Sequence, residues 1–497
     1  MRERITFVHP QGADVDPKSL KISKSELHGP LVQTVRENRL TIALNELPPD
    51  VASLLPRFQE INLRWASSLT YDTIEPFSSR ISPGLHISYT LSSSGDVEAE
   101  RKLCIALLGF GSFDCTSNES FATKSEGLSG NPPSTSLYEQ LESVSLLTTW
   151  TAREFCLEED RDCQSYLQGL SDATSFDISW NSVAQTVRIF SLSPLGPQHI
   201  QASSVSQRRT EVGILSKDAP PNQRPHEIGI SGLLTVLGEK KQPSGTMFSF
   251  ASRHRMSGST FSSQFLEPTG LHPTLQLKLS SNKPPVTDEH CAPHAYFTLP
   301  KTIFADRYQF ADRLFLASKN LTSSRYTSLP VDLEAPAYTT KTWGSNVLLE
   351  LAAPSSNEPE AWTAEVPLHL RYLKPLRSGK VDTEIPYPVV FWACDSAASA
   401  DFTNNPFDRT RLGYDGLFDE NTVFWHVEPR PVSGDRITSP ISVPVLKEHA
   451  ASWVGFGTAA TVALGFTWVL WKLVTVFMAS GYGSNPKKGK KDDKKSK

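Results

Sequence analysis

The sequence has few cysteines and none of the motifs that mark common catalytic sites. Six cysteines in 497 residues are too few to build a disulfide scaffold, so any disulfides would support a hydrophobic core. No G-x-S-x-G, P-loop, H-E-x-x-H or G-x-G-x-x-G pattern occurs. These absences argue against α/β-hydrolases, P-loop enzymes, zinc proteases and dinucleotide-binding enzymes.

The remaining candidates for catalytic chemistry are weak. Asp160 and Asp162 have the D-x-D spacing of a metal site, but they lie in an acidic cluster that is typical of a solvated surface. Cys156 and Cys163 have no histidine nearby, which favours a disulfide or two buried thiols over a zinc site. His294 follows Cys291 by three residues, and we interpret it as a core histidine. We therefore predict no catalytic, cofactor-binding or metal-binding residue.

A basic surface is also missing. The net charge is −4 even though the last residues are rich in lysine, so the rest of the chain is more acidic than this value indicates. Nucleic-acid binding needs a concentrated positive surface. We therefore expect no nucleic-acid partner.

One long apolar segment lies near the C-terminus. Residues 450–471 number 22 and carry no charge, so as a helix they would be about 33 Å long and would cross a hydrocarbon core of roughly 30 Å. Tryptophans near both ends fit the two membrane interfaces. The lysine-rich segment 472–497 predicts a cytosolic C-terminus and a lumenal body. A buried core helix is the less favoured alternative.

The signals for the compartment do not all agree. Asn118 and Asn320 lie in N-glycosylation sequons, which are used only on the translocated side. Lys494 and Lys495 have the spacing of a dilysine signal for return to the endoplasmic reticulum, although any lysine-rich tail can place two lysines there. The first ten residues lack the apolar region of a signal peptide, which leaves a tail-anchored protein with a cytosolic body as the alternative. We favour a single-pass protein of the endoplasmic reticulum membrane with a lumenal body.

The body has the pattern of a mainly β protein. Apolar residues alternate with polar ones in many short runs, for example residues 85–91 and 275–279, and most of the 36 prolines fall between such runs. This pattern predicts β-sandwich-like domains followed by one C-terminal transmembrane helix. Leucines and a valine at helical spacing over residues 137–147, with Ser136 and Glu139 as a capping box, predict one helix within the body.

Changes in composition suggest where the domains end. A segment rich in serine, glycine, proline and asparagine reads as a flexible loop, and the main boundary is expected near residue 245. The predicted parts are an N-terminal β-rich domain (1–116), the flexible loop (117–136), a second, mixed and mostly β region (137–245), a membrane-proximal β domain (246–445), the transmembrane helix (450–471) and the cytosolic lysine-rich tail (472–497).

Several segments of the membrane-proximal domain resemble the signature of the PIG-X family. The resemblance is carried by residues 291–300, 304–309, 332–336, 370–375 and 388–394, together with Gly-Leu-His-Pro at 270–273. The long upstream half is similar to the extended fungal members, the protease B nonderepressible proteins. The signature residues in these segments are His294, Tyr296, Phe297, Pro300, Asp306, Tyr308, Arg371, Tyr372, Phe391 and Trp392.

The resemblance implies a non-catalytic protein. It implies a stabilising subunit of the endoplasmic reticulum mannosyltransferase that adds the first mannose during glycosylphosphatidylinositol (GPI) anchor biosynthesis. Its partner would be the multispanning catalytic subunit of PIG-M type. The alternatives are a general lumenal folding factor and, least favoured, an independent membrane-anchored enzyme. Fungal members also lack a signal peptide and are assigned a lumenal N-terminus.

Three structural hypotheses follow, the first two within this resemblance. The aromatic residues Tyr296, Phe297, Tyr308, Tyr372, Phe391 and Trp392 would form the core of a sandwich. Cys291 and Cys394 would either form a disulfide or remain two buried thiols. Small residues at Gly455, Ala459 and Ala463 would let the membrane helix pack closely against a partner helix, with a simple anchor as the alternative.

Overall fold

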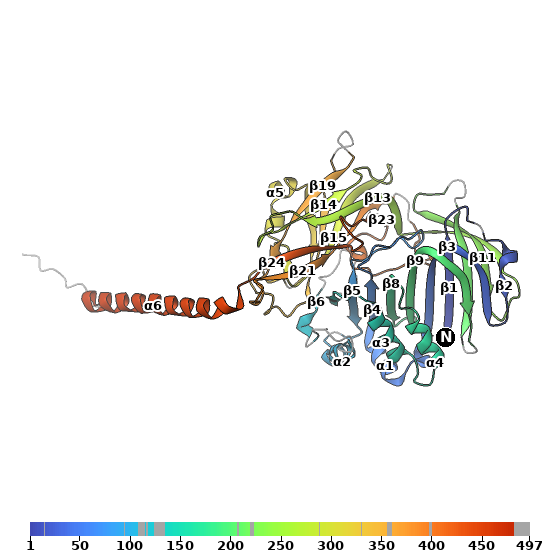
Figure 1. Ribbon diagram of the computed structural model, residues 1–497, viewed down its shortest axis with the longest axis horizontal. Helices are drawn as coiled ribbons and strands as arrows, with labels where there is room; N and C mark the ends of the chain where they lie inside the picture. Colours follow the sequence, from blue (N-terminus) through green and yellow to red (C-terminus); the bar gives the residue numbers. More distant parts are fainter. Residues whose placement is uncertain are drawn as a thin grey trace, which may run out of the picture. The chain divides into compact units, whose positions relative to one another are not determined.

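The computed structural model describes the chain except for residues 14, 94, 108–114, 116–117, 124–134, 206–207, 219–222, 288, 330, 355–359, 397–399 and 482–497. The chain forms two compact units, each described here by itself: Met1–Leu373 with Asp382–Val443, and Lys374–Val381 with Pro444–Lys497. The first unit is built mainly from two β-sheets and the second from one long helix (Figure 1). The predicted fold class, mainly β with one C-terminal apolar helix, is confirmed.

The first sheet is formed by the strands before residue 252. Its neighbours are antiparallel except for β1 and β10, which run parallel. Residues 1–116 and 137–245 therefore contribute strands to the same sheet. Its order is β12 (Ser244–Ala251), β11 (Glu227–Val236), β10 (Arg209–Asp218), β1 (Arg2–His9), β3 (Glu26–Ala43), β9 (Thr186–Ser203), β8 (Ser175–Asn181), β4 (Phe58–Ala66), β5 (Gly84–Leu91), β7 (Thr135–Glu139) and β6 (Ala122–Thr123), with β2 (Lys21–Ile22) paired to β3.

Helices cover one face of this sheet around β4, β5 and β8. These helices are α1 (Pro49–Leu54), α2 (Val97–Leu107), α3 (Ser145–Phe155) and α4 (Arg161–Gln168). Because side chains alternate across a strand, Leu63 and Trp65 of β4 pack into the core with the helices, whereas Asn62 and Arg64 lie on the opposite face. The opposite face therefore carries buried polar groups, which the site below uses.

The helix predicted over residues 137–147 is wrong except for its last three residues, and the predicted capping-box residues Ser136 and Glu139 lie in a strand. Residues up to Glu139 belong to β7, and the helix α3 begins only at Ser145. Leu137 pairs across the sheet with Ile87, so tertiary pairing overrides the local helical spacing. Asp160, the other local signal in this region, accepts a hydrogen bond from the backbone N–H of Cys163 and caps α4.

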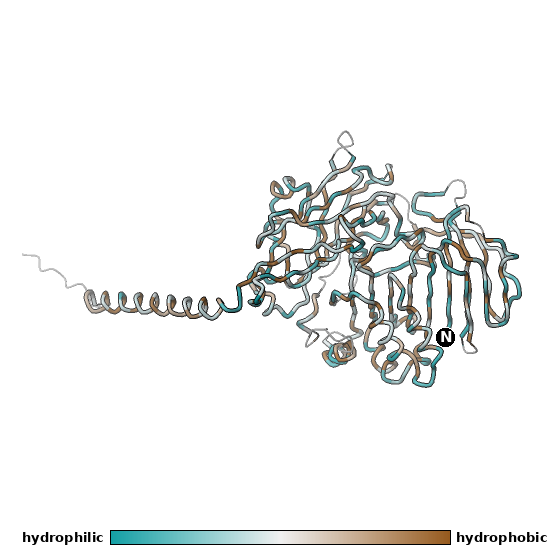
Figure 2. The backbone as a smooth tube through the Cα atoms, in the orientation of Figure 1, coloured by the Kyte–Doolittle hydropathy of each residue, from teal (hydrophilic) through white to brown (hydrophobic). Residues whose placement is uncertain are grey.

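The second sheet has eight strands and curls around a core of its own. Its inner face holds buried residues from all eight strands, including Leu277, Phe297, Leu349 and Trp392. Figure 2 shows hydrophobic and hydrophilic residues alternating along strands of the body. The order is β17 (Leu321–Thr327), β18 (Gly344–Leu351), β15 (His290–Pro300), β22 (Val389–Asp395), β23 (Thr422–Pro429), β13 (His254–Phe265), β14 (Thr274–Leu279) and β19 (Trp362–Pro367), and two short pairs, β16 (Ile303–Phe304) with β20 (His369–Leu370) and β21 (Lys380–Pro386) with β24 (Thr438–Pro444), complete the strands.

The second unit contains the predicted membrane helix. α6 runs over Glu448–Ser480 and ends at Gly481, whose φ of 48° is the left-handed conformation favoured by glycine. Its apolar part, Glu448–Ala479, is the one helix in the described residues that is long and apolar enough to cross a membrane. At about 1.5 Å per residue, this length exceeds what a bilayer core requires. Before the helix, Arg377 pairs with Glu448 at 3.1 Å.

Candidate functional site

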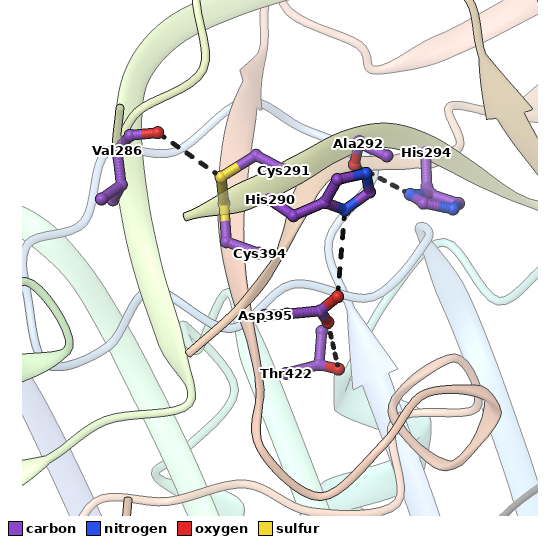
Figure 3. The surroundings of a disulfide bond; sticks show 8 residues. All are labelled: Val286, His290, Cys291, Ala292, His294, Cys394, Asp395 and Thr422. Carbon is purple, nitrogen blue, oxygen red and sulfur yellow. Dashed lines mark hydrogen bonds and ion pairs between the residues drawn. A yellow bond between two sulfur atoms is a disulfide. The ribbon is translucent and has the colours of Figure 1, made fainter. Parts of the chain in front are cut away.

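Two of the signature segments lie on neighbouring strands of the second sheet. β15 and β22 are antiparallel, and their register places Cys291 opposite Cys394 and His294 opposite Phe391. Cys291 and Cys394 form a disulfide (Figure 3) that joins residues 103 apart in the sequence. This cross-link fixes the pairing of the two strands that carry most of the signature.

His294 is enclosed and makes one hydrogen bond through its ring. Its Nδ1 lies 2.9 Å from the carbonyl oxygen of Ala292, and its ring stacks on Phe391 with 5.9 Å between ring centroids. Burial lowers the pKa of His294 to about 4. The imidazole is therefore neutral at pH 7, and its position suits packing better than proton transfer to a substrate.

The aromatic signature residues divide between two cores and the surface. Phe297 and Trp392 point into the inner core of the second sheet, whereas Tyr296 and Phe391 point to its other face. These four are buried, but Tyr308 is 64% exposed and Tyr372 is 65% exposed. The prediction that all six form one core is therefore wrong, because alternation along each strand sends neighbours to opposite faces and the two tyrosines follow short strands at the surface.

The outer face of these strands is covered by the segment that joins β22 to β23. We call residues 400–421 the connecting segment. Its Tyr414 and Phe418 pack on Phe391, with ring centroids 4.9 and 5.7 Å away. The hydroxyl of Tyr414 donates to the carbonyl oxygen of Arg80 at 2.9 Å. This hydrogen bond links the aromatic cluster to the segment between β4 and β5 of the first sheet. His254 and His426 complete the cluster and lie 3.0 Å apart through Nδ1 and Nε2.

A buried ion cluster holds the connecting segment on the first sheet. Arg409 donates to both carboxylate oxygens of Asp177 on β8 at 2.8 Å, and Arg64 on β4 donates to Asp177 at 2.8 Å. All three side chains are buried. A charge-assisted, two-point contact of this kind is both strong and directional. The cluster therefore fixes where the connecting segment lies on the first sheet.

Two further sets of contacts strengthen the joint between the first sheet and the second sheet with its connecting segment. The carbonyl oxygen of Pro406 accepts hydrogen bonds from Arg4 and Arg39, each at 2.8 Å. Glu75, in the segment before β5, pairs with Arg255 of β13 at 2.7 Å and with Lys217. Burial alone would raise the pKa of Glu75, but its hydrogen bonds and the positive charges of these two partners outweigh burial and lower the pKa.

The comparisons with known proteins agree on one family. A family model described as PIG-X / PBN1 matches residues 268–474. Protein pbn1 of Neurospora crassa is 50% identical over 98% of this chain and 97% of its own length, and Protein PBN1 of Gibberella zeae is 49% identical over 97% of each chain. Protein pbn1 of Emericella nidulans is 36% identical over 99% of each chain. The chain belongs to the PIG-X/PBN1 family.

The PIG-X/PBN1 match covers the second sheet from β14 onward and most of α6. The connecting segment, with Arg409 and Tyr414, lies inside it. The solved collagen adhesin of S. aureus aligns with 87% of this chain and 98% of its own, but at 7% identity and a TM-score of 0.13, which is too low to compare the folds.

The other PIG-X signature residues have local structural roles. Asp306 accepts a hydrogen bond from the backbone N–H of Tyr308 at 2.9 Å and so forms a turn after β16. Arg371 is buried, donates to the carbonyl oxygen of Ala335 at 2.8 Å and lies over the ring of Phe304. Pro300 ends β15 opposite Gly344. Glu334 is exposed.

The predicted modification sites are at turns. Asn118 begins a 3-10 helix that ends at Ser120. Asn320 is exposed before β17, with a φ of 55°, and its Nδ2 donates to the carbonyl oxygen of Thr363 at 2.7 Å. Lys494 and Lys495 lie outside the described residues, as does most of the predicted loop 117–136.

Sequence reasoning missed the residues that join the two sheets. Asp177 and Arg409 are 232 positions apart, and neither lies in a motif of recognisable spacing. Charged residues usually lie at the surface, so burial of this pair was not expected. Only the covariation of such positions among relatives could have indicated the contact.

Proposed function

We propose that this chain is a non-catalytic subunit of the endoplasmic reticulum mannosyltransferase that adds the first mannose in GPI-anchor biosynthesis. It would stabilise a multispanning catalytic subunit of PIG-M type. The observation that carries the proposal is membership of the PIG-X/PBN1 family over almost the full chain. This membership supports a role in GPI-anchor biosynthesis.

Three further features support a lumenal body on one membrane span. All six cysteines are paired, as Cys104–Cys115, Cys156–Cys163 and Cys291–Cys394, and disulfides persist in oxidising compartments such as the lumen. Asn320 is exposed, as an acceptor of a glycan must be. α6 supplies the single anchor.

The exposed signature residues support a partner-binding role. Tyr308 and Tyr372 keep large aromatic surfaces in solvent, although they belong to the segments that carry the resemblance. Aromatic residues of this kind are enriched where proteins bind each other. We assign these two side chains to the surface that the catalytic subunit contacts.

Purification of the tagged full-length protein in mild detergent tests the proposal. We expect a multispanning partner in equal amount and an eluate that transfers mannose to glucosaminyl-phosphatidylinositol. Mixed lumenal proteins in small amounts, without transfer activity, would instead favour a general folding factor. Activity without any multispanning partner would make this chain an enzyme.

A surface variant sharpens that test. Replacing Tyr308 and Tyr372 together with serine should lower partner recovery several-fold without changing the melting temperature, because both side chains are exposed. Met247→Ser, at another exposed apolar side chain on β12 in the first sheet, is the control. Equal partner recovery from both variants would remove the tyrosines from the interface.

A further inference from the structure

A cavity of about 380 Å³ lies between the face of the first sheet and the connecting segment. Its volume falls in the range of small-molecule sites. The walls come from β4, β5 and β7 of the first sheet, β15, β17 and β18 of the second sheet, and residues 410–420. The lining includes Asn62, Tyr138, Tyr296, Tyr326, Trp343 and Asn346.

The arginines around the cavity are already paired. Arg411 binds Glu60 at 2.6 Å, Arg64 binds Asp177, and Arg253 donates to backbone carbonyl oxygens, among them that of Asp419 at 2.8 Å. Burial lowers the pKa of His86 to about 4, so this ring is neutral at pH 7. A phosphate or carboxylate would have to displace these partners. The site therefore disfavours an anionic ligand.

Two buried polar groups at the wall have bonding capacity that the described protein does not use. Asn346 and Arg64 are 9% and 7% exposed, and neither the Oδ1 of Asn346 nor the Nε of Arg64 has a hydrogen-bond partner among the described residues. Unpaired buried groups of this kind are uncommon in folded proteins. Both atoms are themselves shielded from solvent, so they mark a polar wall of the cavity and are not direct contacts for a ligand.

Backbone strain is concentrated at the same wall. Arg411 has a φ of 64°, which is rare for a residue other than glycine, and its N–H donates to Asp415 at 2.6 Å. Gly413 has a φ of 98°, and a Cβ there would lie 2.9 Å from the hydroxyl oxygen of Tyr296. The connecting segment therefore approaches β15 as closely as a glycine allows. This close contact keeps the wall of the cavity in one conformation.

We propose that this cavity binds a hexopyranose unit of a glycan. A pyranose ring has apolar C–H faces, which suit the rings of Tyr326 and Tyr296, and hydroxyls around its edge, which accept from amide N–H groups such as those of Asn346. Pairing of the arginines disfavours an anion. Walls made of sheet faces disfavour an extended peptide, which would add to a sheet edge. The proposal does not depend on the assignment to the mannosyltransferase.

Direct binding to the full-length protein in detergent tests the site. Saturation-transfer NMR with a panel of free hexoses and hexosamines should detect saturable binding to the wild type. Asn346→Leu and Tyr326→Ala should each weaken it about tenfold, as loss of one well-made contact predicts. Tyr338→Ala, at an exposed tyrosine outside the lining, should bind as the wild type does.

The two variants separate ligand binding from folding. Asn346→Leu removes no hydrogen bond of Oδ1 within the described protein, so its melting temperature should equal that of the wild type. A glycopeptide and a glycolipid headgroup, each competing with the free sugar, would distinguish a protein glycan from a lipid glycan as the source. No saturable sugar binding, equal binding by all variants, or equal competition by an unglycosylated peptide would overturn the proposal.

Discussion

The two sheets of the body are stabilised in different ways. Helices cover one face of the first sheet, and its two disulfides are local. Cys104–Cys115 joins residues 11 positions apart, and Cys156–Cys163 joins residues 7 positions apart. The second sheet curls around its own core and has one disulfide that spans 103 positions. Local cross-links suffice where helices already fix the neighbourhood. In the second sheet a long-range disulfide joins β15 and β22, whereas β1 and β10 of the first sheet pair across 207 positions, Arg2 opposite Arg209, through the strand ladder itself.

The joint between the sheets depends on charge as much as on apolar contact. Arg409, Asp177 and Arg64 are buried where the connecting segment crosses the first sheet. Because the family-model match begins at residue 268, it includes Arg409 but not its partner Asp177. The matched region thus contains a buried arginine whose charge is compensated only when the first sheet is present. The upstream half of the chain therefore contributes to the structure of the half that carries the family signature.

The largest expected effect comes from breaking the long-range disulfide. In the chain-entropy model, Cys291→Ser with Cys394→Ser should lower the free energy of unfolding by about 4 to 5 kcal/mol, and Cys156→Ser with Cys163→Ser by only about 2 kcal/mol. Denaturant unfolding of the two double variants measures the difference. Equal losses would show that the loop length does not govern the contribution of these cross-links.

The next effect comes from breaking the joint. Arg409→Met should reduce the free energy of unfolding by about 3 to 4 kcal/mol, because Asp177 stays buried with only Arg64 to compensate it. Arg430 is the matched control, since it pairs with Asp72 and Glu428 at an exposed site and should contribute less than about 1 kcal/mol. If Arg409→Met and Arg430→Ala unfold at the same denaturant concentration, the joint does not hold the sheets together.

A smaller effect should appear as a pH dependence of stability. His294 is neutral in the folded protein with a pKa of about 4, whereas the unfolded chain has a value near 6.5. The unfolded state binds the proton first as pH falls, so this group's contribution is present above pH 6.5 and is lost between there and pH 4.

The variant His294→Phe tests this dependence. Between pH 7 and pH 5.5 the wild type should lose about 1 kcal/mol more stability than this variant. His199→Gln, at an exposed histidine of the first sheet, is the control substitution. Parallel pH profiles for wild type and His294→Phe would contradict the assignment.

How much the sequence could predict depended on the range of the interactions. Period-two alternation predicted the strands, and an uncharged run predicted α6, because both signals are local. The same alternation could not say which face of β15 or β22 meets which core, so Tyr296 and Phe297 were predicted to share one. The helix expected at residues 137–147 failed because Leu137 pairs with a distant strand. The cavity was not predictable, since its walls come from six strands and the connecting segment.

The last prediction concerns α6, in contrast to the two sheets. Substitutions on this helix should have the smallest effect on stability and a large effect on assembly with the multispanning partner. Gly455, Ala459 and Ala463 recur every four residues on a helix whose side chains there are exposed in the isolated chain. Small residues at this spacing allow close approach of another helix in a membrane.

Replacing all three with leucine should preserve membrane anchorage, since the apolar length is unchanged, and lower recovery of the multispanning partner several-fold. The matched control replaces Ala450, Gly457 and Thr461 with leucine, which adds bulk on the opposite side of the helix from the three small residues. Unchanged recovery with the leucine variant would make α6 a simple anchor and leave the exposed tyrosines of the second sheet as the remaining interface.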